Sequence, residues 1–283
     1  MKTYLECIPC FIKQALNVCE HIDADEKTRE KIVRRVLKRL SSIDLDKKPP
    51  EFAFYVYNTI EKVSPNIDFY KKIKQKDNLA ALEALAKTKE IVEKAKDPLK
   101  AAAKAAIAGN IMDFAHHNNY NILETVSRSV DEKLSIDHYA KLLAELKQAS
   151  RIAYLADNAG EIVLDRLFIE EIRKITQAEV NFFVRNKPIV NDATIEDAEQ
   201  AGINKVANLK INKIRTTFPF TSNPSFVKFL KDQDVIISKG QANYECLSEL
   251  KANIFFLLIT KCPVITDHIK VKKGTFIIKN NLL

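Results

Sequence analysis

The stretch RIAYLADNAGEIVLDRLFIEEIRKI, at residues 151–175, decides the fold class of this chain. It begins with a short apolar run that is typical of a buried strand, and it ends with apolar side chains at helical spacing. Asp157 and Asn158 stand side by side between the two segments, and Gly160 follows them. A strand that passes directly into an amphipathic helix is the building unit of parallel sheets. We therefore predict that Asp157 and Asn158 lie at the exit of a parallel strand.

Strand-like and helix-like segments continue to alternate after this unit. Further strands are predicted from apolar runs at residues 180–184, 205–211, 234–240, 254–260, 263–266 and 274–279. Gly202 closes a short helix at residues 195–202, and Asn223 caps a helix at 223–232 that has Pro224 at its first position. This alternation predicts an α/β fold, in which a mostly parallel, Rossmann-like sheet has helices on both faces.

Residues 1–150 are predicted to be almost entirely helical. Helical spacing or a high content of strong helix formers is found at residues 10–22, 26–43, 51–63, 77–97 and 98–117. Asp97 and Pro98 fit an N-cap followed by proline at the first helical position. We therefore predict a helical domain over residues 1–150 and an α/β domain over residues 151–283. Because no low-complexity linker separates them, we expect the two domains to pack as one unit, an arrangement that some schemes class as α+β.

Composition and charge narrow the class of protein. The chain has 283 residues, and no apolar run approaches the roughly 18 to 20 residues that a membrane-spanning helix needs. The N-terminus lacks the features of a signal peptide, so we expect a cytoplasmic protein. The net charge is +8, but residues 151–200 hold six basic and ten acidic side chains, and basic residues do not interleave with aromatic ones. We therefore expect no nucleic-acid partner and no membrane partner, and the sequence predicts no oligomeric state.

The chain has five cysteines, of which Cys7 and Cys10 form one CxxC pair. A structural zinc site would need a second pair, and an odd number of cysteines argues against a disulfide framework. Cys7 and Cys10 could touch a functional site, form a redox pair, or serve as small buried apolar side chains. The sequence leaves these alternatives open.

Polar side chains follow three of the predicted strands. Asp157 and Asn158 follow the first strand of the second half, Asp192 lies a few residues past the next strand, and Lys239 ends the strand at 234–240. Because ligands bind outside the carboxyl ends of parallel strands, we expect these side chains to converge on one edge of the sheet. Carboxylate and amide oxygens suit Mg²⁺ or Mn²⁺, while Lys239 and the N-terminus of the helix after Gly160 would attract phosphate. The α/β domain is therefore predicted to bind metal and phosphate.

Each of these residues also has a purely structural interpretation. Asp157 and Asn158 could cap the helix that follows them, and Asn191 and Asp192 could cap the helix at 195. Lys239 could be a solvated loop lysine. Their occurrence after consecutive strands favours a shared site.

The helical half contributes one further candidate, the segment AAIAGNIMDFAHH at 105–117. Asn110 and Asp113 are three residues apart and hence on one face of the predicted helix. Gly109 inside a helix costs about 1 kcal/mol relative to alanine, which close packing or the approach of a ligand would explain. The histidines of this segment lack an HExxH arrangement, so we do not predict zinc. A polar stripe packed near the domain seam is the structural alternative.

The motifs of the chain, taken in order, resemble those of the DUF89 family, whose members are called damage-control phosphatases and share the ARMT1-like fold. The resemblance covers most of the chain, and its CxxC is similar to that of the microbial subfamily. Its motifs are CIPCF at 7–11, GNIMD at 109–113, DNAGE at 157–161, RNKPIVNDAT at 185–194 and SKGQANYE at 238–245. Any one of them is a weak signal, whereas five in this order are specific.

The resemblance implies an enzyme that hydrolyses phosphomonoesters, such as sugar phosphates or damaged phosphometabolites, with a divalent cation of Mg, Mn, Co or Ni. The implied roles are metal ligation by Asp157, Asn158 and Asp192, phosphate contact by Lys239, and substrate contact by Asn110, Asp113, Glu161 and Asn243. Ala242 departs from the family pattern, where glycine is expected, and this affects the backbone freedom of its loop.

We therefore predict hydrolysis of a small phosphorylated metabolite. The nucleophile is either water or a carboxylate, and the DxDx[TV] signature of the best-known carboxylate scheme is absent. If water attacks, Asp113 or Glu161 is a candidate base. The alternative is a nucleotide- or SAM-binding transferase that uses the same strand exits, since one branch of the family has been associated with carboxyl methyl transfer. Gly160 stands alone, however, rather than within a GxGxxG loop. A non-catalytic helical scaffold is a third possibility.

Overall fold

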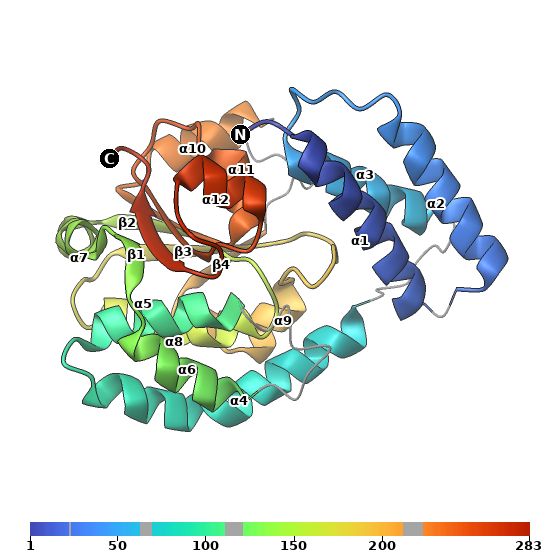
Figure 1. The fold of residues 1–283 in the computed structure, drawn as a ribbon. Helices are drawn as coiled ribbons and strands as arrows, with labels where there is room; N and C mark the ends of the chain where they lie inside the picture. The colour runs from blue at the N-terminus through green and yellow to red at the C-terminus, as the bar shows by residue number, and fades with distance from the viewer. Residues whose placement is uncertain (23, 63–69, 111–120, 212–222) are drawn as a thin grey trace.

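A computed structural model describes residues 1–22, 24–62, 70–110, 121–211 and 223–283 of the chain. These residues form a seven-stranded sheet in the order β1-β7-β6-β5-β2-β3-β4 (Figure 1). The strands are β1 Leu134–Asp137, β2 Arg151–Leu155, β3 Glu179–Val184, β4 Asn208–Ile211, β5 Val235–Lys239, β6 Ile254–Ile259 and β7 Phe276–Asn280. Neighbouring strands pair in parallel, except that β6 and β7 are antiparallel. The predicted α/β fold with a mostly parallel sheet is confirmed.

Helices cover both faces of this sheet, as the alternation predicted (Figure 1). Successive side chains of a strand point to opposite faces, so Tyr154 packs against one layer of helices and Leu155 against the other. The layer on the Tyr154 face consists of α4 Lys71–Lys94, α5 Pro98–Gly109, α6 Ile122–Asp131, α7 Tyr139–Gln148, α8 Glu161–Arg173 and the short α9 Ile195–Gln200 with the turn η3 Ile203–Lys205. The layer on the Leu155 face consists of α10 Pro224–Lys231, α11 Gln241–Leu247 and α12 Pro263–Ile269.

The first three helices form a core of their own beside the sheet (Figure 1). They are α1 Ile8–His21, which follows the turn η1 Leu5–Cys7, α2 Glu26–Leu40 and α3 Pro49–Glu61. Phe11 and Phe52 join α1 to α3 with ring centroids 5.8 Å apart. Ile189, from the loop after β3, is buried in the same core. The α1–α3 cluster therefore packs over a loop at the carboxyl edge of the sheet.

The strand order places a switch point beside β2. From β2 the chain moves outward through β3 and β4, and it returns to β5 on the other side of β2. Strands β2 to β6 all run in one direction, so their carboxyl ends share one edge. In such sheets ligands bind outside the carboxyl ends of the strands where the order reverses. The loops that follow β2, β3 and β5 meet at this point.

Helix α5 packs closely on α8 and positions Asn110. A Cβ added to Gly109 would lie 3.2 Å from the Cα of Glu161, so the close approach of the two helices favours glycine there, as the sequence suggested. The helix ends at Gly109, and Asn110 is its buried C-cap residue. The rest of the predicted helix, residues 111–117, lies outside the described residues. Asp113 and the histidines after it lie outside them.

Two segments differ from the secondary structure that their sequences predicted. Residues 263–266 belong to helix α12 rather than to a strand, because Pro263 fits the first helical turn and Ile265 and Ile269, four residues apart, are buried against the sheet. Strand β1 comes from the half that was predicted to be helical, because it pairs with the distant β7 at the sheet edge. Whether residues 1–150 and 151–283 behave as separate domains stays a prediction.

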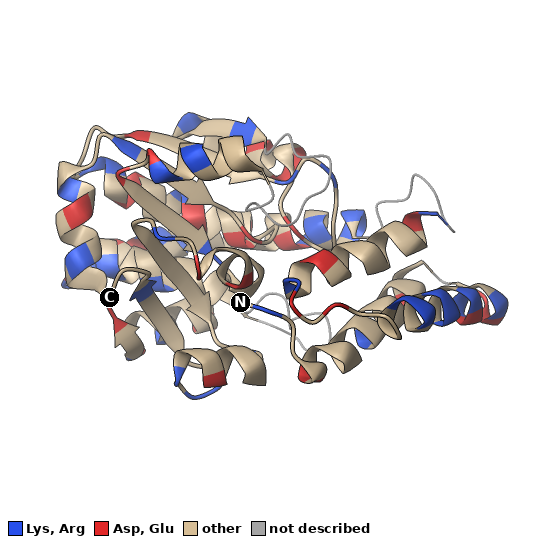
Figure 2. Ribbon diagram, turned by 90° about the horizontal axis from the view of Figure 1, so that it is seen from above, with Lys and Arg blue, Asp and Glu red and all other residues tan. Residues whose placement is uncertain are grey.

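Local signals at the ends of helices were accurate. Asp97 and Asn223 cap α5 and α10 with their side chains, and Gly202 adopts a left-handed conformation after α9. Among the described helices, none combines the length and the apolar character needed to cross a bilayer. Lys and Arg are distributed over many elements and are interleaved with Asp and Glu (Figure 2).

Candidate active site

The loops that follow β2 and β3 are joined by an antiparallel bridge between Asn158 and Asp192. Two backbone hydrogen bonds of 2.9 Å flank this pair, from Ala159 to Asn191 and from Ala193 to Asp157. In this type of pair the two Cα atoms are about 4.5 Å apart and the side chains project from the same face. The structure thus brings the predicted metal ligands of two different loops to one place.

Asp157 lies beside this bridge and is held by two amide groups. Its Oδ2 accepts hydrogen bonds from Nδ2 of Asn110 at 2.7 Å and from Nδ2 of Asn158 at 3.1 Å. Because Asn158 directs its amide nitrogen toward Asp157, its side-chain oxygen Oδ1 points away from Asp157. Asp192 is oriented by Arg185, whose Nε donates to its Oδ2 at 2.5 Å.

Gly240 allows the close approach of β5 to Asp157. A Cβ at this position would lie 1.9 Å from Oδ2 of Asp157, and the backbone has a φ of 76°. Both observations require glycine, since L-residues avoid this conformation and two heavy atoms cannot approach so closely. The glycine after Lys239 is therefore part of the architecture of the site.

Gly240→Ala is expected to destabilise the protein and to displace Asp157. We expect a loss in free energy of unfolding well above the roughly 1–2 kcal/mol that a left-handed conformation costs an L-residue, together with loss of any activity that depends on Asp157. Gly274→Ala is the matched control, because Gly274 has a φ of 82° and no atom lies within 4 Å of its added Cβ. If chemical denaturation gives the two variants equal losses in free energy of unfolding, the steric role of Gly240 is contradicted.

A cavity of about 250 Å³ opens above these side chains. It is lined by the three predicted metal ligands, together with Asn110 and Lys261. The three ligands are Asp157, Asn158 and Asp192. Carboxylate and amide oxygens are hard donors, and an incomplete set of three suits a cation such as Mg²⁺ that keeps water ligands and contacts a substrate phosphate. In the described ranges, no group of three or more His, Cys, Asp or Glu side chains is placed to hold a metal ion. The fit to the predicted cation rests on the chemistry of the two carboxylates and one amide, which are the oxygen donors that such a cation prefers.

Lys239 lies beneath this cavity rather than in its lining. The side chain is fully buried, and its ammonium donates to the carbonyl of Ala106 at 2.9 Å, to Oε1 of Glu161 at 2.6 Å and to Oδ1 of Asp165 at 2.5 Å. An ammonium has three donors, so all are used within the protein. The sequence indicated that Lys239 ends a strand, but it did not show that the side chain turns inward to two carboxylates.

The pKa values of this buried cluster follow from burial and charge. Burial alone would lower the pKa of Lys239, but the Asp165 and Glu161 carboxylates outweigh it and raise that pKa. Burial raises the pKa of Asp165 to about 6, although the nearby Lys239 ammonium opposes the shift. Lys239 is therefore a fixed positive charge that holds two acidic side chains under the cavity.

Glu161 connects the buried cluster to the residues of the cavity. Its Oε1 accepts from Lys239, and its Oε2 accepts from Nδ2 of Asn110 at 2.8 Å and of Asn158 at 3.3 Å. The Asn110 amide thus bridges Glu161 and Asp157. Glu161 is fully buried and does not line the cavity, so its placement favours orientation of the two amides over direct contact with a substrate.

Lys261 lines the cavity and brings a positive charge to it, and the sequence did not identify this residue. Its ammonium donates to the backbone carbonyl of Asn110, and its backbone N–H donates to Oε1 of Gln241 at 2.6 Å. Lys261 comes two residues after the end of β6, so the rule that finds ligands at strand exits would have included it. The strand at 254–260 was predicted, but no residue at its exit was assigned to the site.

Two other groups that were predicted to contact a ligand form hydrogen bonds within the protein. Asn243 lies outside the cavity lining, and its Nδ2 joins the ends of β2 and β5 by donating to the carbonyls of Ala156 at 3.0 Å and Lys239 at 2.8 Å. The backbone N–H of Gly160, at the start of α8, donates to Oδ1 of Asn78 at 2.6 Å. One N–H of the predicted anion site is therefore used by a buried amide.

A second cavity, of about 490 Å³, adjoins the first and lies against the α1–α3 cluster. We call it the α1–α3 chamber; its walls include Phe11, Pro50 and Phe54, as well as the CxxC cysteines. All five cysteines are free, and burial raises the pKa of Cys7 to about 11. The cysteine pair therefore lies next to the candidate site as uncharged thiols.

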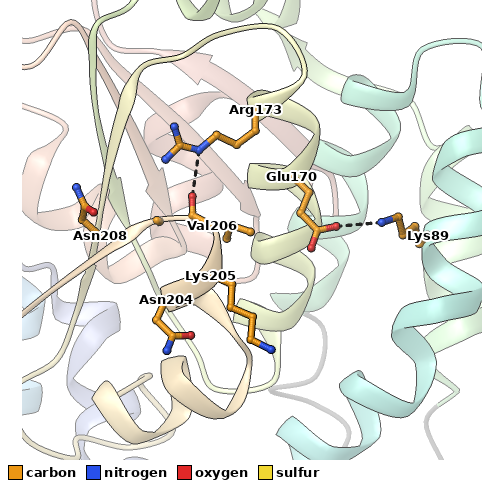
Figure 3. Close-up of a pocket in the computed structure, with 8 residues that line it drawn as sticks. Lys89, Glu170, Arg173, Asn204, Lys205, Val206 and Asn208 are labelled. Atoms are coloured by element: carbon orange, nitrogen blue, oxygen red, sulfur yellow. Dashed lines mark hydrogen bonds and ion pairs between the residues drawn. The ribbon is translucent and has the colours of Figure 1, made fainter.

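A third cavity, of about 560 Å³, is lined by residues of α4, α8 and the segment that leads into β4 (Figure 3). There Lys89 of α4 forms an ion pair of 3.4 Å with Glu170 of α8, and Nε of Arg173 donates to the carbonyl of Val206 at 3.1 Å. Asn208, at the amino end of β4, also lines it. Its position at the amino ends of the strands separates it from the site described above.

The fold and the carboxyl-edge cavity define a Rossmann-like α/β protein with a candidate cation and anion site at the switch point. The chain belongs to the family with the damage-control phosphatase ARMT1-like domain, whose model matches residues 3–277. Two relatives are the damage-control phosphatase PH1575 of Pyrococcus horikoshii, 33% identical over 99% of both chains, and a damage-control phosphatase of Archaeoglobus fulgidus, 31% identical over 99% of both. A crystal structure of the DUF89 family protein PH1575 covers 99% of each chain, with a TM-score of 0.89 and 32% identity.

Proposed function

We propose that this protein is a divalent-metal-dependent phosphatase that hydrolyses small phosphomonoesters, such as sugar phosphates or damaged phosphometabolites. The observation that carries the proposal is the opposition of Asp192 to Asn158 across the bridge, with Asp157 beside them in one cavity. The names of the family and of its relatives support phosphatase chemistry. Among Mg²⁺, Mn²⁺, Co²⁺ and Ni²⁺, the donor set favours the harder ions.

Some residues of the cavity would bind the cation, and others would contact the phosphate. Asp157, Asn158 and Asp192 would hold the cation, which when bound offsets the negative charge of the phosphoryl oxygens. Lys261 lines the same cavity and would place a second positive charge against those oxygens. Asn110 orients Asp157, and Lys239 secures Glu161 below them.

A phosphatase assay with a panel of esters and metals tests this function. The purified chain is stripped of metal and then assayed on sugar phosphates, nucleotides and p-nitrophenyl phosphate with each of the four ions. Release of inorganic phosphate that depends on an added ion is expected. Absence of turnover on every ester with every ion would refute the proposal, and transfer of a methyl group from SAM would favour the transferase alternative.

Lys261→Ala is expected to weaken phosphate binding while leaving cation binding intact. Loss of one desolvated charge contact with phosphate corresponds to about 10- to 100-fold in KM or in the inhibition constant of inorganic phosphate. Calorimetric titration of Mn²⁺ should show an unchanged affinity, because the proposed cation ligands are retained. Lys251→Ala, at an exposed position before β6, is the matched control. If Lys261→Ala leaves phosphate inhibition unchanged, the cationic role of Lys261 is wrong.

A further inference from the structure

Two adjoining cavities meet at the candidate site, and they differ in character. The 250 Å³ cavity holds the proposed cation ligands, whereas the larger α1–α3 chamber is bounded by side chains of α1 and α3. The residues that line both cavities are Val190, Asp192, Gln241, Ala242 and Glu245. A molecule bound across this boundary would therefore have one end in each cavity.

The α1–α3 chamber suits a carbon skeleton better than a phosphate. Phe11 and Phe54 contribute aromatic rings, and Pro50 and Ile189 contribute further apolar surface. Gln14, from α1, also lines it and supplies polar hydrogen-bonding atoms. Pockets for small molecules typically combine an apolar lining with a few placed polar groups. If phosphate occupies the smaller cavity, the alcohol part of the ester would occupy this chamber.

Glu245 stands at the boundary between the two cavities. It lies on α11, which follows β5, and its side chain is partly accessible. The carboxylates of Asp157, Glu161 and Asp192 each accept hydrogen bonds from neighbouring side chains. Among the described residues, by contrast, none donates a hydrogen bond to the Glu245 carboxyl or forms an ion pair with it. The α-ammonium of Met1 binds the backbone carbonyl of Glu245 instead, at 2.8 Å.

A carboxyl group without a protein partner in a secluded place is a candidate for contact with a ligand. Burial raises the pKa of Glu245 to about 8, and the charge of the N-terminus opposes this shift only in part. The charge of the N-terminus therefore compensates only part of the cost of burying the charged form of Glu245. No structural contact in the described chain accounts for an acid at this position.

We propose that Glu245 is a catalytic residue that protonates the leaving-group oxygen, and that the α1–α3 chamber holds the alcohol that departs. The inference rests on the proposed phosphatase function. As the P–O bond to the alcohol breaks, its electron pair stays on the oxygen, and the proton of Glu245 forms the new O–H bond. Water supplies the oxygen that phosphorus gains, and the proton that water releases returns to the Glu245 carboxylate or passes to solvent.

The dependence of rate on the leaving group tests this assignment. Wild type, Glu245→Gln and Glu245→Asp are assayed on benzyl, phenyl, p-nitrophenyl and 2,4-dinitrophenyl phosphate with saturating Mn²⁺. For Glu245→Gln we expect kcat/KM to fall by about 100-fold on benzyl and phenyl phosphate, whose oxygens need a proton, and to change by less than about 3-fold on 2,4-dinitrophenyl phosphate. Glu245→Asp keeps an acid at a greater distance, so we expect a smaller loss with the same trend.

Two measurements separate this role from others. Asp267→Asn, at an exposed acid on α12, is the control and should match wild type on every ester. Mn²⁺ affinity, measured by calorimetry, should be equal in wild type and Glu245→Gln. An equal loss on all four esters, or loss of Mn²⁺ binding, would overturn the assignment in favour of a structural or metal-binding role. If wild type itself hydrolyses none of the esters, the proposed function fails and the assignment fails with it.

Discussion

Asp157→Ala is expected to lose divalent-cation binding and phosphatase activity together. The substitution removes one of two carboxylates from the proposed set of three oxygen donors, and the other two residues would retain at most weak affinity for the cation. We expect turnover of p-nitrophenyl phosphate with Mg²⁺ or Mn²⁺ to fall by at least about 1,000-fold. Calorimetric titration of Mn²⁺ into the variant should give no measurable heat of binding.

The stability of Asp157→Ala distinguishes loss of the site from loss of the fold. Asp157 and Glu161 share the Nδ2 donor of Asn110, so their carboxylates lie close together and repel each other. Removing one of them should leave the free energy of unfolding without cation largely unchanged. Asp267→Ala, an exposed acid on α12, is the control for both measurements. Retained metal-dependent turnover in Asp157→Ala would refute the proposed site.

Lys239→Met is expected to cause the largest loss of stability. The substitution leaves Glu161 and Asp165, which are both fully buried, without the cation that lies 2.6 Å and 2.5 Å from their oxygens. Removing one partner of a buried ion pair typically costs about 3–5 kcal/mol in free energy of unfolding. Chemical denaturation measures this loss. Lys187→Met is the control, because Lys187 pairs with Glu61 on the surface, where such pairs contribute less than about 1 kcal/mol.

The pH dependence of the Lys239→Met variant has a definite sign. In the wild type the pKa of Asp165 is already raised to about 6 by burial, and loss of the ammonium raises it further. The folded state then binds a proton more tightly than the unfolded state, so the variant loses stability as pH rises toward that folded pKa. The deficit relative to wild type should be larger at pH 8 than at pH 5. If the variant is fully stable but binds phosphate more weakly, Lys239 contacts phosphate directly, as the sequence predicted.

The position of the site could be predicted from the sequence because its signals are local. Apolar runs followed by helical spacing marked strands β2, β3 and β5, and parallel strands have their carboxyl ends at one edge. Asp157, Asn158 and Asp192 were therefore expected together before any contact was known. The caps at Asp97 and Asn223 are equally local, since each side chain bonds an N–H within three residues.

Other features depend on contacts between residues that are distant in the chain. The sequence of residues 263–266 suits a strand or a helix, and pairing of β6 with β7 decided the outcome by leaving the segment to cover a sheet face. Strand β1 has only four residues, and its position depends on β7, which follows much later in the chain. Such pairings cannot be read from the period of a short segment.

The sequence by itself determined a parallel α/β sheet, a family, and two acids and an amide at neighbouring strand exits. Only the tertiary structure decided which lysine faces the cavity, and that the Glu245 carboxyl lies between two cavities with no hydrogen-bond or ion-pair partner among the described residues. The reason is physical. Lys239 turns inward because α5 and α8, packed closely at Gly109, bring a carbonyl and two carboxylates to its ammonium, and the free energy of that buried charge depends on neighbours from these two other elements.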